Sequence, residues 1–137
     1  MGDWNADFLT MDKKKIMLVD DEAGFTSLLK LNLEKTERFE VFVENDATKA
    51  MAGVREFRPD VLLLDVVMPE MDGGDIVAEL RMDPGLKSLP IIMLTALISK
   101  DEISADAVAQ SENLIMLAKP VDMKMLLRVV DEALEPA

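Results

Sequence analysis

The sequence predicts a single α/β domain of the (βα)₅ type, in which a five-stranded parallel sheet is doubly wound, with helices on both faces. Two observations carry this prediction. The chain has 137 residues, a length typical of one domain. Short aliphatic and β-branched runs alternate along it with longer stretches whose apolar residues recur at helical spacing. Strands that alternate with helices form parallel pairs through right-handed crossovers.

The five expected strands are aliphatic runs bounded by polar, turn or cap residues. They span 15–19, 39–43, 61–64, 90–94 and 114–117. The run Val61-Leu-Leu-Leu64 is apolar throughout, as in a central strand covered on both faces. The run Phe39-Glu-Val-Phe-Val43 alternates in character, and this predicts an edge strand.

A helix is expected after each strand. Asp46 and Asp122 can cap the second and the fifth helix, and Pro59 ends the second. The segment from Ser99 to Glu102 has capping-box spacing and starts the fourth helix, whose periodicity is the weakest. The apolar faces of the other four helices are Phe25, Leu28, Leu29 and Leu33; Ala47, Ala50, Met51, Val54 and Phe57; Ile76, Val77 and Leu80; and Met123, Leu126, Leu127, Val130 and Leu134.

We assign residues 13–135 to this domain and residues 1–12 to an N-terminal extension. The extension has three interpretations. It is a frayed, disordered tail, or it results from a start codon upstream of an older one at Met11, or its apolar residues form one turn that docks on the domain or on a partner. Those residues are Trp4, Phe8, Leu9 and Met11.

Composition excludes several classes of function. The chain contains neither His nor Cys, which removes imidazole chemistry, thiolate chemistry and disulfides. Acidic residues outnumber basic ones by 27 to 15, and the formal net charge of −12 repels nucleic acid and anionic membranes. No secretory signal and no apolar run of membrane-spanning length is present, so we expect a cytoplasmic protein with neither nucleic acid nor membrane as a partner.

Polar residues gather at the carboxyl ends of the expected strands, where parallel α/β sheets bind their ligands. Asp20 and Asp21 follow the first strand, Asp65 the third, Thr95 the fourth and Lys119 the fifth. Taken singly, each is most often a turn, cap or surface residue. Taken together, they place three carboxylates, a hydroxyl and an ammonium at one edge of the sheet.

This combination favours phosphoryl chemistry with a divalent cation. Crowded carboxylates repel one another, and a hard cation such as Mg²⁺ or Mn²⁺ relieves that repulsion. Because nitrogen and sulfur ligands are missing, the cation is expected to be held by oxygen alone. An Asp carboxylate beside such a cation can attack a phosphoryl group, and Lys119 and Thr95 can contact its oxygens.

The run Asp65-Val-Val-Met-Pro-Glu-Met-Asp-Gly73 resembles the phosphoacceptor loop of response-regulator receiver domains. Asp20-Asp21, Thr95-Ala96 and Lys119-Pro120 complete the family pattern, and the resemblance covers residues 13–135. The order and spacing of these motifs are similar to those of chemotaxis-type single-domain receivers of two-component systems. The resemblance implies a flavodoxin-like fold with strand order 2-1-3-4-5 and a cis peptide bond between Lys119 and Pro120.

The resemblance also implies the role of each site residue. Asp65 takes a phosphoryl group from a histidine-kinase phosphohistidine. Asp21, Asp65 and the backbone carbonyl of Val67 ligate Mg²⁺, and Asp20 assists through a water molecule. Lys119 and Thr95 contact the phosphoryl group. Such a domain is not a turnover enzyme, because it promotes only its own phosphorylation and a slow autodephosphorylation.

The expected partners are a sensor histidine kinase or a phosphotransfer protein, and a downstream protein target that the sequence does not name. The target, or a second copy in a homodimer, is expected on the fourth helix, the fifth strand and the fifth helix. The family usually carries an aromatic residue at the position of Met116, so we expect a smaller surface change on phosphorylation. Val67 and Leu97 are apolar where many relatives place polar groups, which predicts slow loss of the phosphoryl group.

Two other interpretations require residues that this sequence lacks. A flavin binder would need aromatic residues and a hydroxyl-rich phosphate loop, and a haloacid-dehalogenase-type phosphatase would need an Asp where Val67 stands. The remaining alternative is a non-phosphorylated receiver-fold adapter that serves only as a protein-interaction module.

Overall fold

The computed structural model describes residues 13–66, 68, 73–95 and 114–135. Its elements, in chain order, are β1 (Lys14–Val19), α2 (Ala23–Glu34), β2 (Phe39–Glu44), the 3₁₀ turn η1 (Ala47–Lys49), α3 (Ala50–Phe57), β3 (Val61–Asp65), α4 (Gly73–Met82), β4 (Ile91–Thr95), β5 (Leu114–Ala118) and α6 (Met123–Leu134). The expected extension 1–12 and the expected helix after Ser99 lie outside the described residues.

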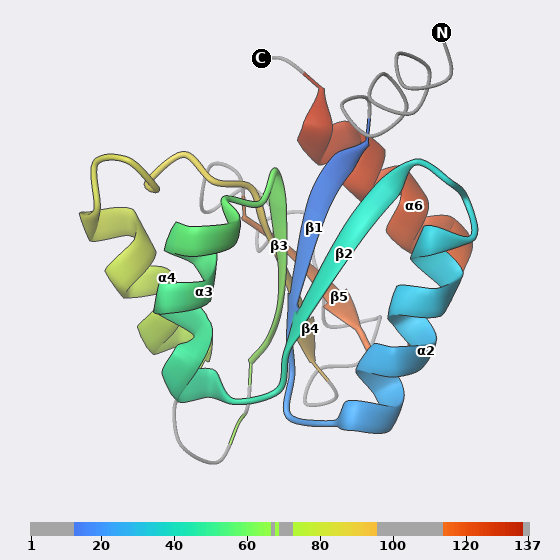
Figure 1. Ribbon diagram of the computed structural model, residues 1–137, viewed down its shortest axis with the longest axis horizontal. Helices are drawn as coiled ribbons and strands as arrows, with labels where there is room; N and C mark the ends of the chain where they lie inside the picture. Colours follow the sequence, from blue (N-terminus) through green and yellow to red (C-terminus); the bar gives the residue numbers. More distant parts are fainter. Residues whose placement is uncertain (1–12, 67, 69–72, 96–113, 136–137) are drawn as a thin grey trace, which may run out of the picture.

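The five strands form one parallel sheet in the order β2-β1-β3-β4-β5, which confirms the predicted fold class and strand order. β2 is an edge strand, as its alternating residues predict, and β3 lies in the middle with every residue buried. All five strands run in the same direction, so their carboxyl ends share one edge of the sheet, the lower edge in Figure 1.

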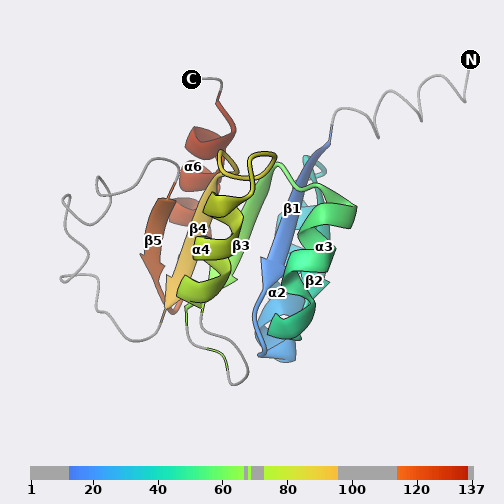
Figure 2. The ribbon, with the colours of Figure 1, turned by 90° about the vertical axis from the view of Figure 1, so that its left-hand side faces the viewer.

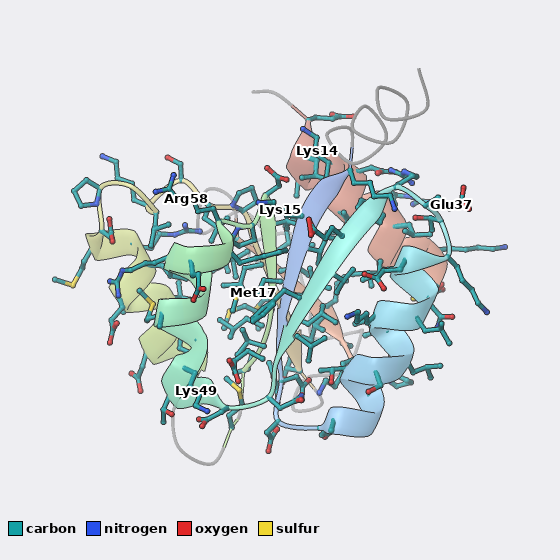
Figure 3. The ribbon with its side chains drawn as sticks, viewed as in Figure 1. Lys14, Lys15, Met17, Glu37, Lys49 and Arg58 are labelled. Carbon is teal, nitrogen blue, oxygen red and sulfur yellow. The ribbon has the colours of Figure 1, made fainter. Side chains whose placement is uncertain are left out.

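Helices cover both faces of the sheet. α3 and α4 lie on one face, and α2 and α6 on the other (Figures 1 and 2). Each pair of helices closes its own core cluster, because alternate residues of a strand point to opposite faces. On β1, Ile16 and Leu18 belong to the cluster under α2 and α6, whereas Met17 and Val19 belong to the cluster under α3 and α4. Figure 3 shows Met17 directed from β1 toward α3.

The apolar face predicted for α2 is wrong at one position. Leu28 is 59% exposed, whereas Thr26 is buried together with Leu29 and Leu33. Thr26 can be buried because its hydroxyl group donates to the Ala23 carbonyl at 3.1 Å and accepts from Asn45 at 3.0 Å. These two hydrogen bonds remove the usual cost of burying a hydroxyl group, and they turn Leu28 outward.

The predicted caps are confirmed. The Asp46 carboxylate accepts from the Thr48 amide at 3.0 Å, so Asp46 caps η1, which runs into α3. The Asp122 carboxylate accepts from the amides of Lys124 and Met125 at 2.9 and 3.4 Å and caps α6. α3 ends at Phe57, two residues before Pro59, as predicted.

One hydrogen bond covers part of the free edge of β2. The carboxylate of Glu34, at the end of α2, accepts from the Val41 amide at 3.1 Å. Val41 is in the edge strand, so this carboxylate occupies a donor that a further strand would otherwise use. No helix of the described residues is both long and apolar enough to span a membrane.

Candidate functional site

Three carboxylates meet at the carboxyl edge of the sheet. Asp20 and Asp21 directly follow β1, and Asp65 is the last residue of β3. One carboxylate oxygen from each residue lies within 4.8 Å of the others. Asp20 is 2% exposed and Asp65 is 6% exposed, whereas Asp21 is open to solvent. The predicted carboxylate cluster is therefore present, with two buried members and one at the surface.

Lys119 comes from the end of β5 and lies against this cluster. Its ammonium nitrogen is 2.7 Å from an Asp20 carboxylate oxygen and 3.8 Å from an Asp65 carboxylate oxygen, and its side chain is 12% exposed. The Lys119 amide donates to the Thr95 carbonyl at 2.8 Å, which ties the residue after β5 to the end of β4. The peptide bond between Lys119 and Pro120 is cis, as the resemblance implied.

The charge of Lys119 is set by two opposing effects. Burial alone would lower the pKa of the Lys119 ammonium, because it removes water from the charged form. The hydrogen bond and the charge of Asp20, assisted by the charges of Asp65 and Glu22, outweigh burial and raise this pKa. Lys119 therefore carries a full positive charge beside Asp65 at neutral pH.

Asp20 is held in place by its neighbours on the chain and by Asn45. Its second carboxylate oxygen accepts from the Glu22 amide at 3.0 Å, just where α2 begins. Its backbone carbonyl accepts from the Asn45 side chain at 2.7 Å. These contacts leave one oxygen of the buried Asp20 for Lys119 and orient it toward the other carboxylates.

The end of the loop after β3 packs directly against the backbone of Asp65. The Gly73 amide donates to the Val66 carbonyl at 2.8 Å. A β-carbon at Gly73 would lie 2.4 Å from the Asp65 carbonyl oxygen and 2.9 Å from the Val66 α-carbon. Residue 73 must therefore be glycine for α4 to begin this close to Asp65.

The structure adds a residue that the sequence did not indicate. Phe25, on the first turn of α2, places its ring centroid 4.5 Å from the Lys119 ammonium nitrogen, a cation–π contact. Apolar spacing placed Phe25 on the buried face of the helix, and no local pattern pairs it with a lysine so far along the chain.

The remaining predicted residues are placed as follows. Thr95 ends β4 and is buried. Met116 lies half-buried in β5 and packs against the core cluster under α3 and α4. Val67 and Leu97 lie outside the described residues, as does the segment of the expected fourth helix. The basic run that contains Lys14 and Lys15 lies at the opposite edge of the sheet (Figure 3), so it does not neutralise the carboxylates.

The donor set of the cluster suits a hard divalent cation. Three carboxylates within 4.8 Å supply oxygen atoms only, and the chain has no nitrogen or sulfur ligand to offer from His or Cys. Mg²⁺ is bound in proteins by one or two carboxylates together with water and phosphate oxygens. The residues present therefore fit this ion.

Comparison with known proteins identifies the family. The family model of the response regulator receiver domain matches residues 16–131. The DNA-binding response regulator MtrA of Mycolicibacterium paratuberculosis is 37% identical over 114 residues, which are 83% of this chain and 48% of that protein. PhoP, the alkaline phosphatase synthesis transcriptional regulatory protein of Bacillus subtilis, is 38% identical over 89 residues, or 65% of this chain and 35% of that protein.

Solved structures agree. The chemotaxis response regulator CheY4 of Vibrio cholerae superimposes with a TM-score of 0.72 at 30% identity, covering 88% of this chain and 98% of that one. The receiver domain of a signal transduction histidine kinase from Syntrophus aciditrophicus gives a TM-score of 0.74 at 27% identity, covering 88% and 89%.

The chain thus belongs to the response regulator receiver domain family of two-component systems. It spans about half the length of MtrA and about a third of the length of PhoP.

Proposed function

We propose that this receiver domain is phosphorylated on Asp65 with the help of Mg²⁺ or Mn²⁺, and that phosphorylation switches a protein-binding surface. The observation that carries the proposal is the position of the Lys119 ammonium, 2.7 Å from Asp20 and 3.8 Å from Asp65, within a cluster of three carboxylates. The buried Asp65 carboxylate, beside the Lys119 ammonium, is suited to attack a phosphoryl group. The ammonium can neutralise part of the negative charge of that group.

In the proposed reaction, a carboxylate oxygen of Asp65 forms a bond to phosphorus while the bond between phosphorus and the donor nitrogen of a phosphohistidine breaks. The donor leaves as a neutral imidazole after taking up a proton. Lys119 pairs with the phosphoryl oxygens, and the hydroxyl group of Thr95 donates a hydrogen bond to one of them. The chain promotes only its own phosphorylation and a slow loss of the phosphoryl group, so it is not a turnover enzyme.

The divalent cation would be held by Asp21, Asp65 and the backbone carbonyl of Val67, with Asp20 assisting through water. When bound, it supplies positive charge that reduces the repulsion between the incoming phosphoryl group and the carboxylates. The donor set of oxygen atoms supports this part of the proposal.

The proposed partners are a sensor histidine kinase or a phosphotransfer protein as donor, and a protein target downstream. We propose that the target, or a second copy of the chain, docks on β5, α6 and the helix expected after Ser99, which lies outside the described residues. Neither MtrA nor PhoP defines that target, because the match covers less than half of each protein. MtrA is named a DNA-binding response regulator and PhoP a transcriptional regulatory protein, and these names describe those longer proteins.

The proposal is tested by labelling with acetyl phosphate in Mg²⁺ and by beryllofluoride binding, followed by intact mass and amide NMR spectra. We expect one phosphoryl group on the wild-type chain and none on Asp65→Asn. Asp21→Ala is expected to stay folded and unlabelled, because it removes a carboxylate of the cation site. Asp75→Ala, which removes an exposed carboxylate from the first turn of α4, serves as the control and should label normally. A folded wild-type chain that is not labelled would instead indicate the non-phosphorylated adapter.

A further inference from the structure

We infer that Phe25 is a positioning residue for Lys119: the face of its ring holds the ammonium group beside Asp65. This inference deepens the proposed function and depends on it for its kinetic consequence. The inference is based on a contact between Phe25 in the first turn of α2 and Lys119 at the end of β5, two elements that are far apart in sequence. The ring centroid lies 4.5 Å from the ammonium nitrogen, inside the range of a favourable cation–π contact.

The ring is itself partly buried by packing. Phe25 packs against the core cluster that contains Leu29 and Leu33 of α2, so its position is set by the same packing that docks the helix on the sheet. α2 begins beside the site, because Asp20 accepts a hydrogen bond from the amide of Glu22, the cap residue of the helix. The carboxylate and the ring that contact Lys119 are therefore fixed by one continuous segment, residues 20–25.

Phe25 gives the ammonium a contact that does not depend on a carboxylate. Among the described residues, the Lys119 ammonium lies 2.7 Å from a carboxylate oxygen of Asp20 and 3.8 Å from one of Asp65. A cation bound to the carboxylate cluster competes with Lys119 for the charge of Asp20. The ring carries no charge and no oxygen atom that could ligate a divalent cation, so such a cation does not compete with Lys119 for this contact.

The effect is tested with Phe25→Leu, which keeps an apolar side chain and removes the ring, and with Phe25→Tyr, which keeps the ring. At saturating Mg²⁺ and acetyl phosphate, we expect Phe25→Leu to slow phosphorylation by about threefold to tenfold, the range that a partly desolvated cation–π contact supplies. The Mg²⁺ concentration for half-maximal rate should stay unchanged, and Phe25→Tyr should restore the rate.

A spectroscopic measurement separates this inference from the proposed function, because it needs no phosphorylation. Methylene protons of Lys119 near the face of the ring have resonances displaced by the ring current. We expect this displacement in the wild-type and Phe25→Tyr chains and its loss in Phe25→Leu.

Phe57→Leu is the matched control. Phe57 also has a lysine over its ring, Lys15 at 5.3 Å, but this pair lies at the other edge of the sheet. Phe57→Leu should leave the phosphorylation rate and the Lys119 resonances unchanged. The inference is overturned if Phe25→Leu keeps the displaced resonances or the wild-type rate, or if Phe57→Leu slows phosphorylation equally. An unlabelled wild-type chain that still shows the displaced resonances overturns only the proposed function.

Discussion

Gly73 leaves no room for a side chain beside the backbone of Asp65. We predict that Gly73→Ala is destabilised by at least about 1–3 kcal/mol, the usual cost of overpacking, because the added carbon meets backbone atoms and not flexible side chains. The added carbon would meet the carbonyl oxygen of Asp65 itself, so the variant should also bind beryllofluoride more weakly. Chemical denaturation and beryllofluoride titration measure the two effects.

Gly24→Ala provides the comparison. Gly24 is exposed in the first turn of α2, and nothing lies within 4 Å of a β-carbon placed there. Alanine should leave stability unchanged or raise it by up to about 1 kcal/mol, since glycine is the poorer helix former. If both variants lost the same stability, the close approach of Gly73 to Asp65 would not be the cause.

The site residues that the sequence predicted share one property: each directly follows, or ends, an aliphatic run that forms a strand. Because parallel strands end at one edge, position along the chain was enough to bring Asp20, Asp65 and Lys119 together. Phe25 could not be predicted, since its contact with Lys119 depends on how α2 lies against the end of β5. Gly73 ends the motif that begins at Asp65, but its close approach to the Asp65 backbone depends on the three-dimensional structure.

At the scale of elements, the start of α6 depends on one carboxylate. Asp122 accepts from two amides of the first turn, so Asp122→Ala should destabilise the domain by about 0.5–2 kcal/mol. α6 contributes Leu126, Val129 and Val130 to the core. Fraying of its first turn therefore lowers the free energy of unfolding of the whole domain. The free energy of unfolding from urea denaturation measures the effect.

Asp122→Asn is the matched variant, because asparagine removes the charge and keeps a side-chain oxygen that can accept from the same amides. We expect it to retain most of the wild-type stability. A loss as large as that of Asp122→Ala would assign the effect to the charge of Asp122 and not to the cap hydrogen bonds.

Sequence periodicity predicted the type and order of the described elements and failed at the face of α2. Leu28 and Thr26 are two positions apart on the helix, and hydrophobicity alone favours burying leucine. The structure buries Thr26 because Asn45, which follows β2, reaches its hydroxyl group. That partner comes from a different element, so no pattern within the helix could indicate it.

For the molecule as a whole, the free edge of β2 is the kind of surface through which sheet proteins associate without control. We predict that Glu34→Ala associates more readily than the wild-type chain, because it uncovers the Val41 amide on the edge strand. Sedimentation velocity over a range of protein concentrations measures this association.

Glu40→Ala is the control for charge. Glu40 is an exposed carboxylate on β2, so its loss changes the net charge equally and leaves the hydrogen bond of Glu34 in place. Equal association of both variants would attribute the effect to reduced repulsion between negatively charged copies. Association of Glu34→Ala alone supports the covering of the edge.

The parallel sheet was predictable from the alternation of strands and helices, but the strand order came from the family resemblance. Alternation does not say on which side of β1 a later strand will pair. In the structure, Ile16 of β1 lies between Val41 of β2 and Val61 of β3, and this register depends on how helices pack over both faces.

The order β2-β1-β3-β4-β5 also matters while the chain is being synthesised. β1 and β2 leave the ribosome first, β3 joins the free edge of β1, and each later strand joins the edge left by the one before it. No strand has to be inserted between two that are already paired. The core under α2 nevertheless includes Leu126, Val129 and Val130 of α6. Ile16 and Leu18 of β1 therefore stay incompletely covered until α6 has been synthesised. While only the N-terminal half of the domain has been synthesised, the apolar side of β1 that α6 later covers is exposed to chaperones and to aggregation.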